Sequence, residues 1–123
     1  MAGTKNKKPL VLSYAGCSTC KRALKWLAER GIDADVRAIV DAPPTAAELA
    51  QWIPRSERPV RKWLNTSGQS YRALGKATID AASDDDLVTM LTKDGKLVKR
   101  PVLVTAKGVL VGFDEAAYAK AFD

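Results

Sequence analysis

Residues 9–31 are PLVLSYAGCSTCKRALKWLAERG, a short apolar run, two cysteines and a longer amphipathic run. Pro9 to Tyr14 is apolar and bounded by a polar tail and Gly16, a pattern typical of a short buried strand. From Ser18 to Arg30 the apolar residues follow helical spacing, and Gly31 is the expected stop past a helix end. The inner face of this helix is predicted to carry four residues: Cys20, Leu24, Leu27 and Ala28. The stretch therefore predicts a strand leading into a helix, with the cysteines at the junction.

The flanking segments extend this unit. Asp35 to Val40 is predicted to be a second strand, with Val36, Ala38 and Val40 on one face, which completes a β-α-β unit. Near the C-terminus, Pro101 to Thr105 and Val109 to Gly112 are apolar runs joined through Lys107-Gly108, which indicates a hairpin. Asp114 is then placed to cap a last helix whose inward residues would be Ala117, Tyr118 and Phe122.

The middle of the chain is predicted to be helical. Thr45 and Glu48 form a capping box for a helix that runs to about Ile53, and Pro54 to Pro59 is predicted to be a connector. Val60 to Leu74 is predicted to form short helices, interrupted at Asn65-Thr66-Ser67-Gly68. Ser83 and the three aspartates after it predict a helix start, with the helix running through Leu91.

The resulting order is β-α-β, a helical insert, then β-β-α. Two such halves around one four-stranded mixed sheet make an α/β fold of the thioredoxin-like type. At 123 residues, we expect one domain at 9–123 with the insert at about 44–93, preceded by a flexible basic tail at 1–8.

The composition excludes several classes of protein and of functional site. The net charge is +6, but no dense basic run is present, so direct nucleic-acid binding is not expected. Attraction of a small anionic substrate would explain the positive charge equally well. The chain has no histidine and only two cysteines, which excludes Cys-His catalysis and a closed zinc site, so we expect no metal and no bound cofactor. No run approaches the ~20 apolar residues of a membrane span, and Met1 to Lys8 lacks a hydrophobic segment. We therefore expect a cytoplasmic monomer without a membrane association.

The two cysteines carry the predicted chemistry. Cys17 sits where unpaired backbone N–H groups of a helix start converge, which favours its thiolate, and Lys21 and Arg22 act in the same direction. Cys20 is three residues on and shares that side of the first turn, so a disulfide is within reach. The alternative interpretation is that the two cysteines are small buried side chains that have this spacing by chance. Their position after a strand and at the start of a helix favours redox chemistry instead. Cys17 is the predicted nucleophile and Cys20 the predicted resolving cysteine.

A second feature is Lys99-Arg100-Pro101. On the residues alone, an ordinary edge-strand proline with solvated basic neighbours is the favoured interpretation, although X-Pro bonds also adopt the cis form.

The chain resembles the arsenate reductase (ArsC)/Spx family, especially its C-x-x-C branch, over about Val11 to Phe122. The resemblance rests on motifs in order: Cys17-Ser18-Thr19-Cys20, Asn65-Thr66-Ser67-Gly68, Tyr71-Arg72, Leu74-Gly75, Lys99-Arg100-Pro101 and Val111-Gly112-Phe113. It implies a thioredoxin fold with a helical insert and a cis Pro101 facing the cysteine loop. It also implies that Cys17 is the catalytic or switch cysteine and that Arg100 stabilises its thiolate or a bound oxyanion. The substrate-binding positions are then expected to be Gly16, Ser18, Thr19, Lys21, Asn65 and Pro101.

The chain departs from the family pattern at the oxyanion site. Glutaredoxin-coupled arsenate reductases carry one nucleophilic cysteine and three oxyanion-binding arginines, whereas here only Arg100 matches and Asn65 and Phe113 occupy the other two positions. Four other basic residues are alternatives, although a solvated helix face is the favoured interpretation for them: Arg58, Arg61, Lys62 and Arg72.

The predicted function is a thiol-disulfide reductase acting on a small oxyanion such as arsenate. Cys20 would resolve the reaction to an internal disulfide, recycled by thioredoxin or by glutathione and glutaredoxin. Two alternatives remain: an Spx-like redox switch that binds RNA polymerase, and a glutathione-dependent general thiol reductase. The segment 65–68 resembles the enzyme-like uncharacterised members of the family more than the regulators, which favours an enzyme.

Overall fold

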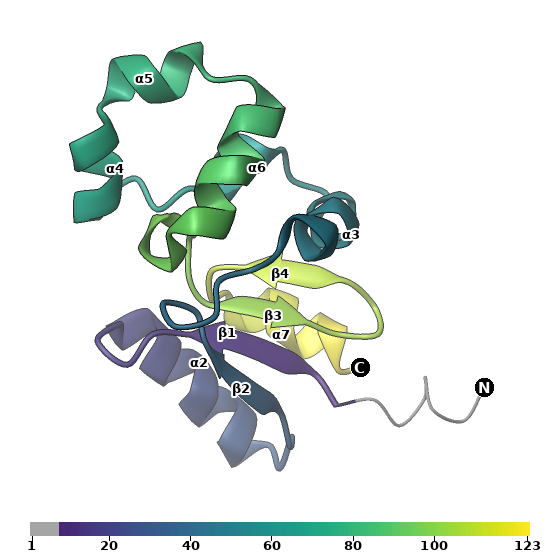
Figure 1. Cartoon of the computed structure of the whole chain (residues 1–123). Helices are drawn as coiled ribbons and strands as arrows, with labels where there is room; N and C mark the ends of the chain where they lie inside the picture. The colour runs from purple at the N-terminus through teal and green to yellow at the C-terminus, as the bar shows by residue number, and fades with distance from the viewer. Residues whose placement is uncertain (1–7) are drawn as a thin grey trace. The chain divides into compact units, whose positions relative to one another are not determined.

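The structure, a computed structural model, describes residues 8–123, so the predicted tail lies outside the described residues except for Lys8. Tertiary contacts divide the chain into two units, which are described separately (Figure 1). The first unit comprises the chain up to Ala38 together with Arg100–Asp123, and the second comprises Ile39–Lys99. The prediction of one domain with an insert at about 44–93 stays a prediction.

The first unit is built on a four-stranded sheet. Its elements in chain order are β1 (Leu10–Ser13), α2 (Ser18–Glu29), β2 (Asp35–Ala38), β3 (Val102–Val104), β4 (Val109–Val111) and α7 (Glu115–Ala121). The strand order is β2-β1-β3-β4, with β1 parallel to β2 and antiparallel to β3, and with β3 antiparallel to β4. The predicted α/β fold with a four-stranded mixed sheet is confirmed.

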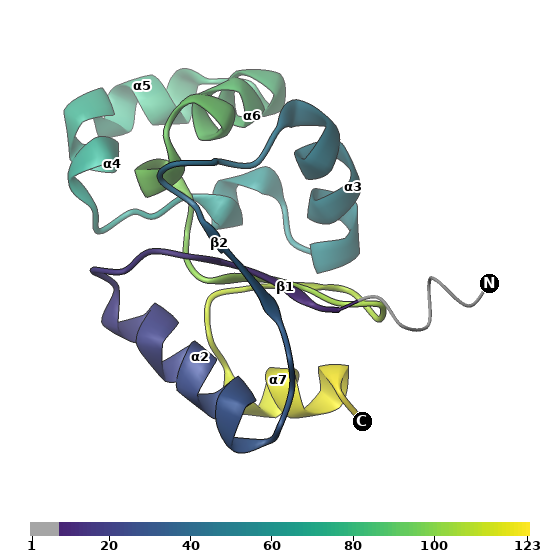
Figure 2. The ribbon, with the colours of Figure 1, turned by 60° about the horizontal axis from the view of Figure 1, so that its bottom comes forward.

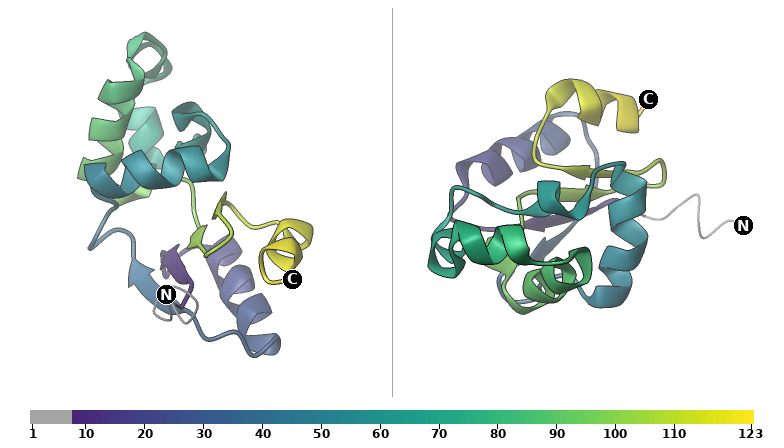
Figure 3. Two further views of the ribbon diagram at one scale, coloured as in Figure 1. Left: turned by 90° about the vertical axis from the view of Figure 1, so that its right-hand side faces the viewer. Right: turned by 90° about the horizontal axis from the view of Figure 1, so that it is seen from above.

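Helices α2 and α7 cover the same face of this sheet (Figure 2; Figure 3, left). The core between them and the sheet consists of Val11, Ala23, Trp26, Leu27, Leu103 and Tyr118. The Trp26 and Tyr118 rings meet edge to face with centroids 5.6 Å apart, a favoured aromatic geometry that ties α2 to α7.

Two details of the predicted burial were wrong. On α2, Ala28 is exposed, and Ala23 and Trp26 lie on the inner face with Cys20 and Leu27, because the buried stripe starts with a step of three residues rather than four. On β2, Val36 is 57% exposed, so the apolar alternation there does not mark a buried face. Tyr118 is fully buried, as predicted.

The second unit is helical. It contains α3 (Ala46–Ser56), a 3₁₀ turn η1 (Val60–Trp63), α4 (Gln69–Leu74), α5 (Lys76–Ala81), α6 (Asp84–Lys93) and a 3₁₀ turn η2 (Gly95–Leu97). Capping boxes start α3, at Thr45 and Glu48, and α6, at Ser83 and Asp86. The helix start at each of these positions agrees with its prediction.

The predicted end of α3 and the stretch after Leu74 needed correction. Helix α3 continues past Ile53 because Pro54 is in the last turn, where its missing N–H removes one hydrogen bond only, and Glu57 ends the helix in the left-handed region at φ 58°. Helix α5 was not predicted, since no side chain caps its start; Lys76 and Asp80 pair along it at 2.7 Å.

Among the described residues, none of the helices has the length and apolar character needed to cross a membrane.

Candidate active site

Cys17 is the N-cap residue of α2. Its backbone is extended (φ −102°, ψ 114°), and its sulfur accepts the backbone N–H of Cys20 at 3.3 Å. Its carbonyl accepts the N–H of Lys21 at 3.1 Å, which is the first bond of the helix ladder. The sulfur therefore satisfies a free N–H at the positive end of a 12-residue helix, a position that favours a thiolate.

A turn between β1 and α2 holds the cysteine in this position. The carbonyl of Tyr14 accepts the N–H of Cys17 at 3.0 Å. The Tyr14 ring lies against the turn, and a Cβ on Gly16 would be 2.9 Å from the ring atom Cε2. Glycine at position 16 therefore lets the ring pack against the backbone just before Cys17.

Arg100 reaches the same site from the start of β3. Its guanidinium hydrogen-bonds the Cys17 sulfur, and its Cζ lies 4.9 Å from the centroid of the Tyr14 ring. The peptide bond between Arg100 and Pro101 is cis, as the family resemblance implies. The edge-strand interpretation was wrong, because β3 lies between β1 and β4, Pro101 is buried and Arg100 is half-buried.

The two thiols have different pKa values for physical reasons. Partial burial raises the pKa of Cys17, but hydrogen bonds from the thiol and amide of Cys20 and from the Arg100 guanidinium outweigh it, so the pKa lies below the ordinary thiol value. Cys20 is fully buried, and burial raises its pKa, as does the hydrogen bond that its thiol donates to Cys17. Cys17 is thus the more acidic thiol of the pair and Cys20 the neutral thiol beside it, and their roles as nucleophile and resolving cysteine stay predictions.

This difference predicts how the thiols react. In the reduced protein, alkylation by iodoacetamide should modify Cys17 first, and the rate should reach half its maximum at a pH below the ~8.5 of an unperturbed cysteine. The sign follows from the lowered pKa, since the thiolate fraction persists as the pH falls until the Cys17 pKa is reached. Peptide mass mapping across a pH series measures this, and equal rates at both cysteines would contradict it.

The other predicted residues of the first unit lie on the opening turn of α2 or just before it. Ser18 and Lys21 are exposed, and half-buried Thr19 accepts a hydrogen bond from Arg22 at 3.4 Å. Gly16 is exposed as well. The roles of Gly16, Ser18, Thr19 and Lys21 in substrate binding stay predictions.

Asn65 belongs to the second unit, where its contacts are with its own loop. Its backbone N–H donates to Leu97 at 2.7 Å, its side-chain amide donates to Lys96 at 3.4 Å, and its side-chain oxygen accepts from Ser67 at 3.2 Å. These bonds fix the loop between η1 and α4, and a substrate-binding role stays a prediction.

The alternative basic residues of the second unit divide into two pairs. Arg61 donates to the carbonyls of Ile79 (3.0 Å) and Ala82 (2.6 Å) at the end of α5, and Arg72 donates to the carbonyl of Ser67 at 3.1 Å. Both guanidiniums therefore hold backbone of their own unit. Arg58 and Lys62 are exposed.

Sequence reasoning did not single out Tyr14 as part of the site. The ring contacts Arg100 and the carbonyl fixes Cys17, yet from the sequence Tyr14 was only the end of an apolar strand. An aromatic residue three positions before Cys17, with a glycine between them, was the available signal.

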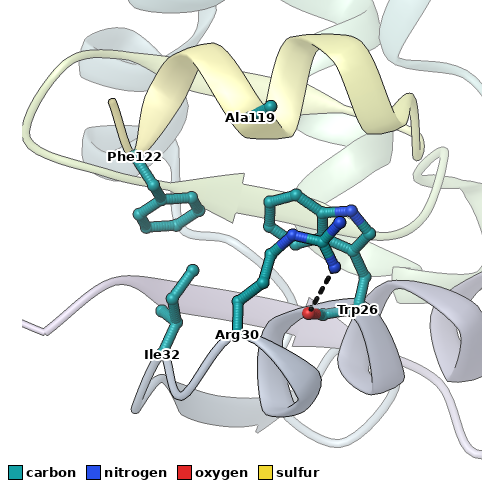
Figure 4. A pocket seen from close by; sticks show the side chains of 5 residues that line it. All are labelled: Trp26, Arg30, Ile32, Ala119 and Phe122. Carbon is teal, nitrogen blue, oxygen red and sulfur yellow. Dashed lines mark hydrogen bonds between the residues drawn. The ribbon is translucent and has the colours of Figure 1, made fainter.

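A separate cleft of about 280 Å³ lies near the C-terminal end of α2, between α2 and α7, and Figure 4 shows its lining: Trp26, Arg30, Ile32, Ala119 and Phe122. The Arg30 guanidinium stacks on the Trp26 ring, 3.9 Å from its centroid, and donates to the Trp26 carbonyl at 3.4 Å. Cys17 and Cys20 are not among its lining residues. Among residues 8–123, no three Cys, Asp or Glu side chains are grouped so that they could hold a metal ion.

Comparison with known proteins gives consistent matches over most of the chain. The sequence model of the ArsC family matches residues 12–121. The crystal structure of an ArsC family related protein from Bacteroides fragilis is 44% identical, with a TM-score of 0.87 over 94% of this chain and 99% of that one. A structure described as a possible arsenate reductase from Streptococcus mutans UA159 is 37% identical, with a TM-score of 0.83 over 94% and 98% of the two chains.

Curated relatives extend the comparison. The uncharacterized protein YusI of Bacillus subtilis (strain 168) is 38% identical over 83% of this chain and 87% of its own length. More distantly, the global transcriptional regulator Spx of Streptococcus pyogenes is 24% identical over 80% of this chain and 73% of its own length.

Proposed function

Because this chain belongs to the ArsC family, we propose that it is a thiol-disulfide reductase that reduces a small oxyanion such as arsenate. The observation that carries the proposal is the asymmetry of the thiol pair. Cys17 is a helix N-cap with a lowered pKa next to Arg100, and Cys20 is a buried thiol with a raised pKa that donates to the Cys17 sulfur. A nucleophile and a resolving thiol are the two groups that such a reduction requires.

The proposed reaction has two steps on the protein. The Cys17 thiolate attacks the arsenic of arsenate, a sulfur–arsenic bond forms, and an arsenic-bound oxygen leaves as water after protonation. Cys20 then attacks the Cys17 sulfur, the sulfur–arsenic bond breaks, and its electron pair remains on arsenic, which is released as arsenite. The two thiols are oxidised to a Cys17–Cys20 disulfide by two electrons in total.

The contacts between the thiols set the order of the steps. The hydrogen bond with Cys17 and the charge of its thiolate both raise the pKa of Cys20. Once Cys17 is bound to substrate, that charge is consumed, so the pKa of Cys20 falls and Cys20 becomes a better nucleophile. Cys20 therefore stays protonated until there is an adduct to resolve.

Stabilisation of the anion is assigned to the residues around Cys17. Arg100 and the free N–H groups at the start of α2 supply positive charge and donors at the nucleophile. Arg61 and Arg72 are engaged with backbone carbonyls of their own unit, so the proposal does not depend on them.

The protein has to be returned to the dithiol form after each cycle. Thioredoxin, or glutathione with glutaredoxin, is proposed as the external reductant that attacks the disulfide and leaves oxidised. The cytoplasm, where such reductants keep thiols reduced, is the compartment in which this cycle would run.

The test is arsenate-dependent NADPH oxidation by the reduced protein with thioredoxin and thioredoxin reductase, repeated with glutathione, glutaredoxin and glutathione reductase. Steady turnover in either system, abolished by Cys17→Ser, is the expected result, and the more active system identifies the reductant. Lack of arsenate-dependent turnover in both systems, with the disulfide still forming reversibly, would exclude arsenate as substrate.

A redox-switch regulator is the second candidate, favoured by the likeness to Spx and by the same disulfide-competent pair. Under this alternative the disulfide is a signal, and RNA polymerase is the proposed partner. Binding to purified RNA polymerase that changes between the oxidised and reduced protein, without turnover, would support it. Reduction of glutathione mixed disulfides, with no response to arsenate, would instead support a general thiol reductase.

A further inference from the structure

Tyr14 contacts Cys17, Cys20 and Arg100, the three residues whose side chains meet at the proposed nucleophile. Its carbonyl accepts the N–H of Cys17 at 3.0 Å, and its backbone also hydrogen-bonds Cys20. Its ring is half-buried against the turn at Gly16 and faces the Arg100 guanidinium, with 4.9 Å from Cζ to the ring centroid. That distance is within the ~6 Å over which a cation is attracted to an aromatic face.

We propose that Tyr14 is a positioning residue that holds the Arg100 guanidinium on the Cys17 sulfur. Arginine is a long side chain with about 2 kcal/mol of rotamer entropy, so each contact that fixes its orientation helps to keep the guanidinium at the sulfur. The ring gives the guanidinium a contact on a rigid part of the fold, because Tyr14 directly follows β1, which pairs with β3 just after Arg100. Tyr14 thus acts on Cys17 through Arg100 and has no contact with substrate assigned to it.

The ring is itself held in place, as a positioning role requires. The turn hydrogen bond to Cys17 fixes the Tyr14 backbone, and the ring approaches Gly16 so closely that a Cβ there would displace it. Gly16 and Tyr14 therefore act together: the glycine makes space for the ring, and the ring holds the guanidinium of Arg100. The inference rests on the proposed function only in taking Cys17 as the reacting thiol.

The test measures the Cys17 pKa directly, by the pH dependence of alkylation and by thiolate absorbance in the reduced full-length chain. Phenylalanine at position 14, Tyr14→Phe, keeps the ring face, so the Cys17 pKa should remain near that of the unmodified protein. Phenylalanine analogues with increasing fluorination at the same position have nearly the same shape but a weaker negative ring face. Along this series the pKa should rise stepwise, with the alkylation rate at low pH falling by about threefold to fivefold in total.

A second background separates positioning from a general structural effect. In Arg100→Ala the guanidinium is gone, so the same fluorinated series should give a constant Cys17 pKa. A flat series in the Arg100 protein, or an equal rise in both backgrounds, would overturn the proposal. Because the thiol titration needs neither arsenate nor a reductant, this result is independent of whether the proposed substrate is correct.

Discussion

Replacing Cys20 with serine is expected to stop the reaction after its first step. Cys17 keeps Arg100 and the helix N-terminus, so it can still attack substrate, but no internal thiol is left to break the bond to the adduct. With thioredoxin as the reductant, steady-state turnover should fall by roughly a hundredfold or more, as expected when a group required for one chemical step is removed. Intact-protein mass spectrometry after incubation with arsenate should show one adduct per chain, located at Cys17.

Cys20 is fully buried, so a substitution there can also affect the stability of the fold. Serine would place a hydroxyl in that position, which is costly if it lacks a partner, so Cys20→Ala serves as a second variant that removes the thiol without burying a polar group. The Cys17→Ser protein is the control that should form no adduct. Undiminished turnover of both Cys20 variants with thioredoxin alone would show that an external thiol resolves the adduct and would contradict the assigned role of Cys20.

The local part of the site could be predicted from sequence because it depends on neighbouring residues. A cysteine that caps a helix after a strand, and a second cysteine one turn on, follow from the spacing within residues 9–31, and the structure has Cys17 at the N-cap with its sulfur on the Cys20 N–H. The same holds for the capping box that starts α3 at Thr45. Such features are set by short-range hydrogen bonds, which leave a signature in adjacent residues.

The rest of the site depends on strand order, which the residues alone did not give. Arg100 meets Cys17 because β3 pairs with β1, so 83 positions of sequence separate two groups that share a hydrogen bond. The apolar run after Pro101 indicated a strand but not a central one, and for this reason Pro101 was interpreted as an edge residue; only the family resemblance implied its cis bond and the role of Arg100. Tyr14 was missed for the same reason, since its partner is distant in sequence.

Among alanine substitutions at the glycines of the second unit, Gly95→Ala is expected to be the most destabilising. Gly95 is buried at the start of η2, and a Cβ there would overlap the Ile39 carbonyl, with 2.6 Å to its carbon and 3.0 Å to the Cα of Val40. These are backbone atoms, so no side chain can rotate away, and the two segments have to separate. We expect a loss of about 3 kcal/mol in the free energy of unfolding, at the upper end of the range for overpacking.

Gly31 provides a matched control that separates lack of space from backbone conformation. Gly31 has φ +68°, and nothing lies within 4 Å of the position of its Cβ, whereas Gly95 is not among the positive-φ glycines of the described residues. Gly31→Ala should therefore cost about 1 kcal/mol, from the left-handed conformation alone. Urea unfolding of both variants measures the difference. If Gly95→Ala were no less stable than Gly31→Ala, the close approach of η2 to Ile39 would not be a constraint on the fold, and the burial of Gly95 would need another explanation.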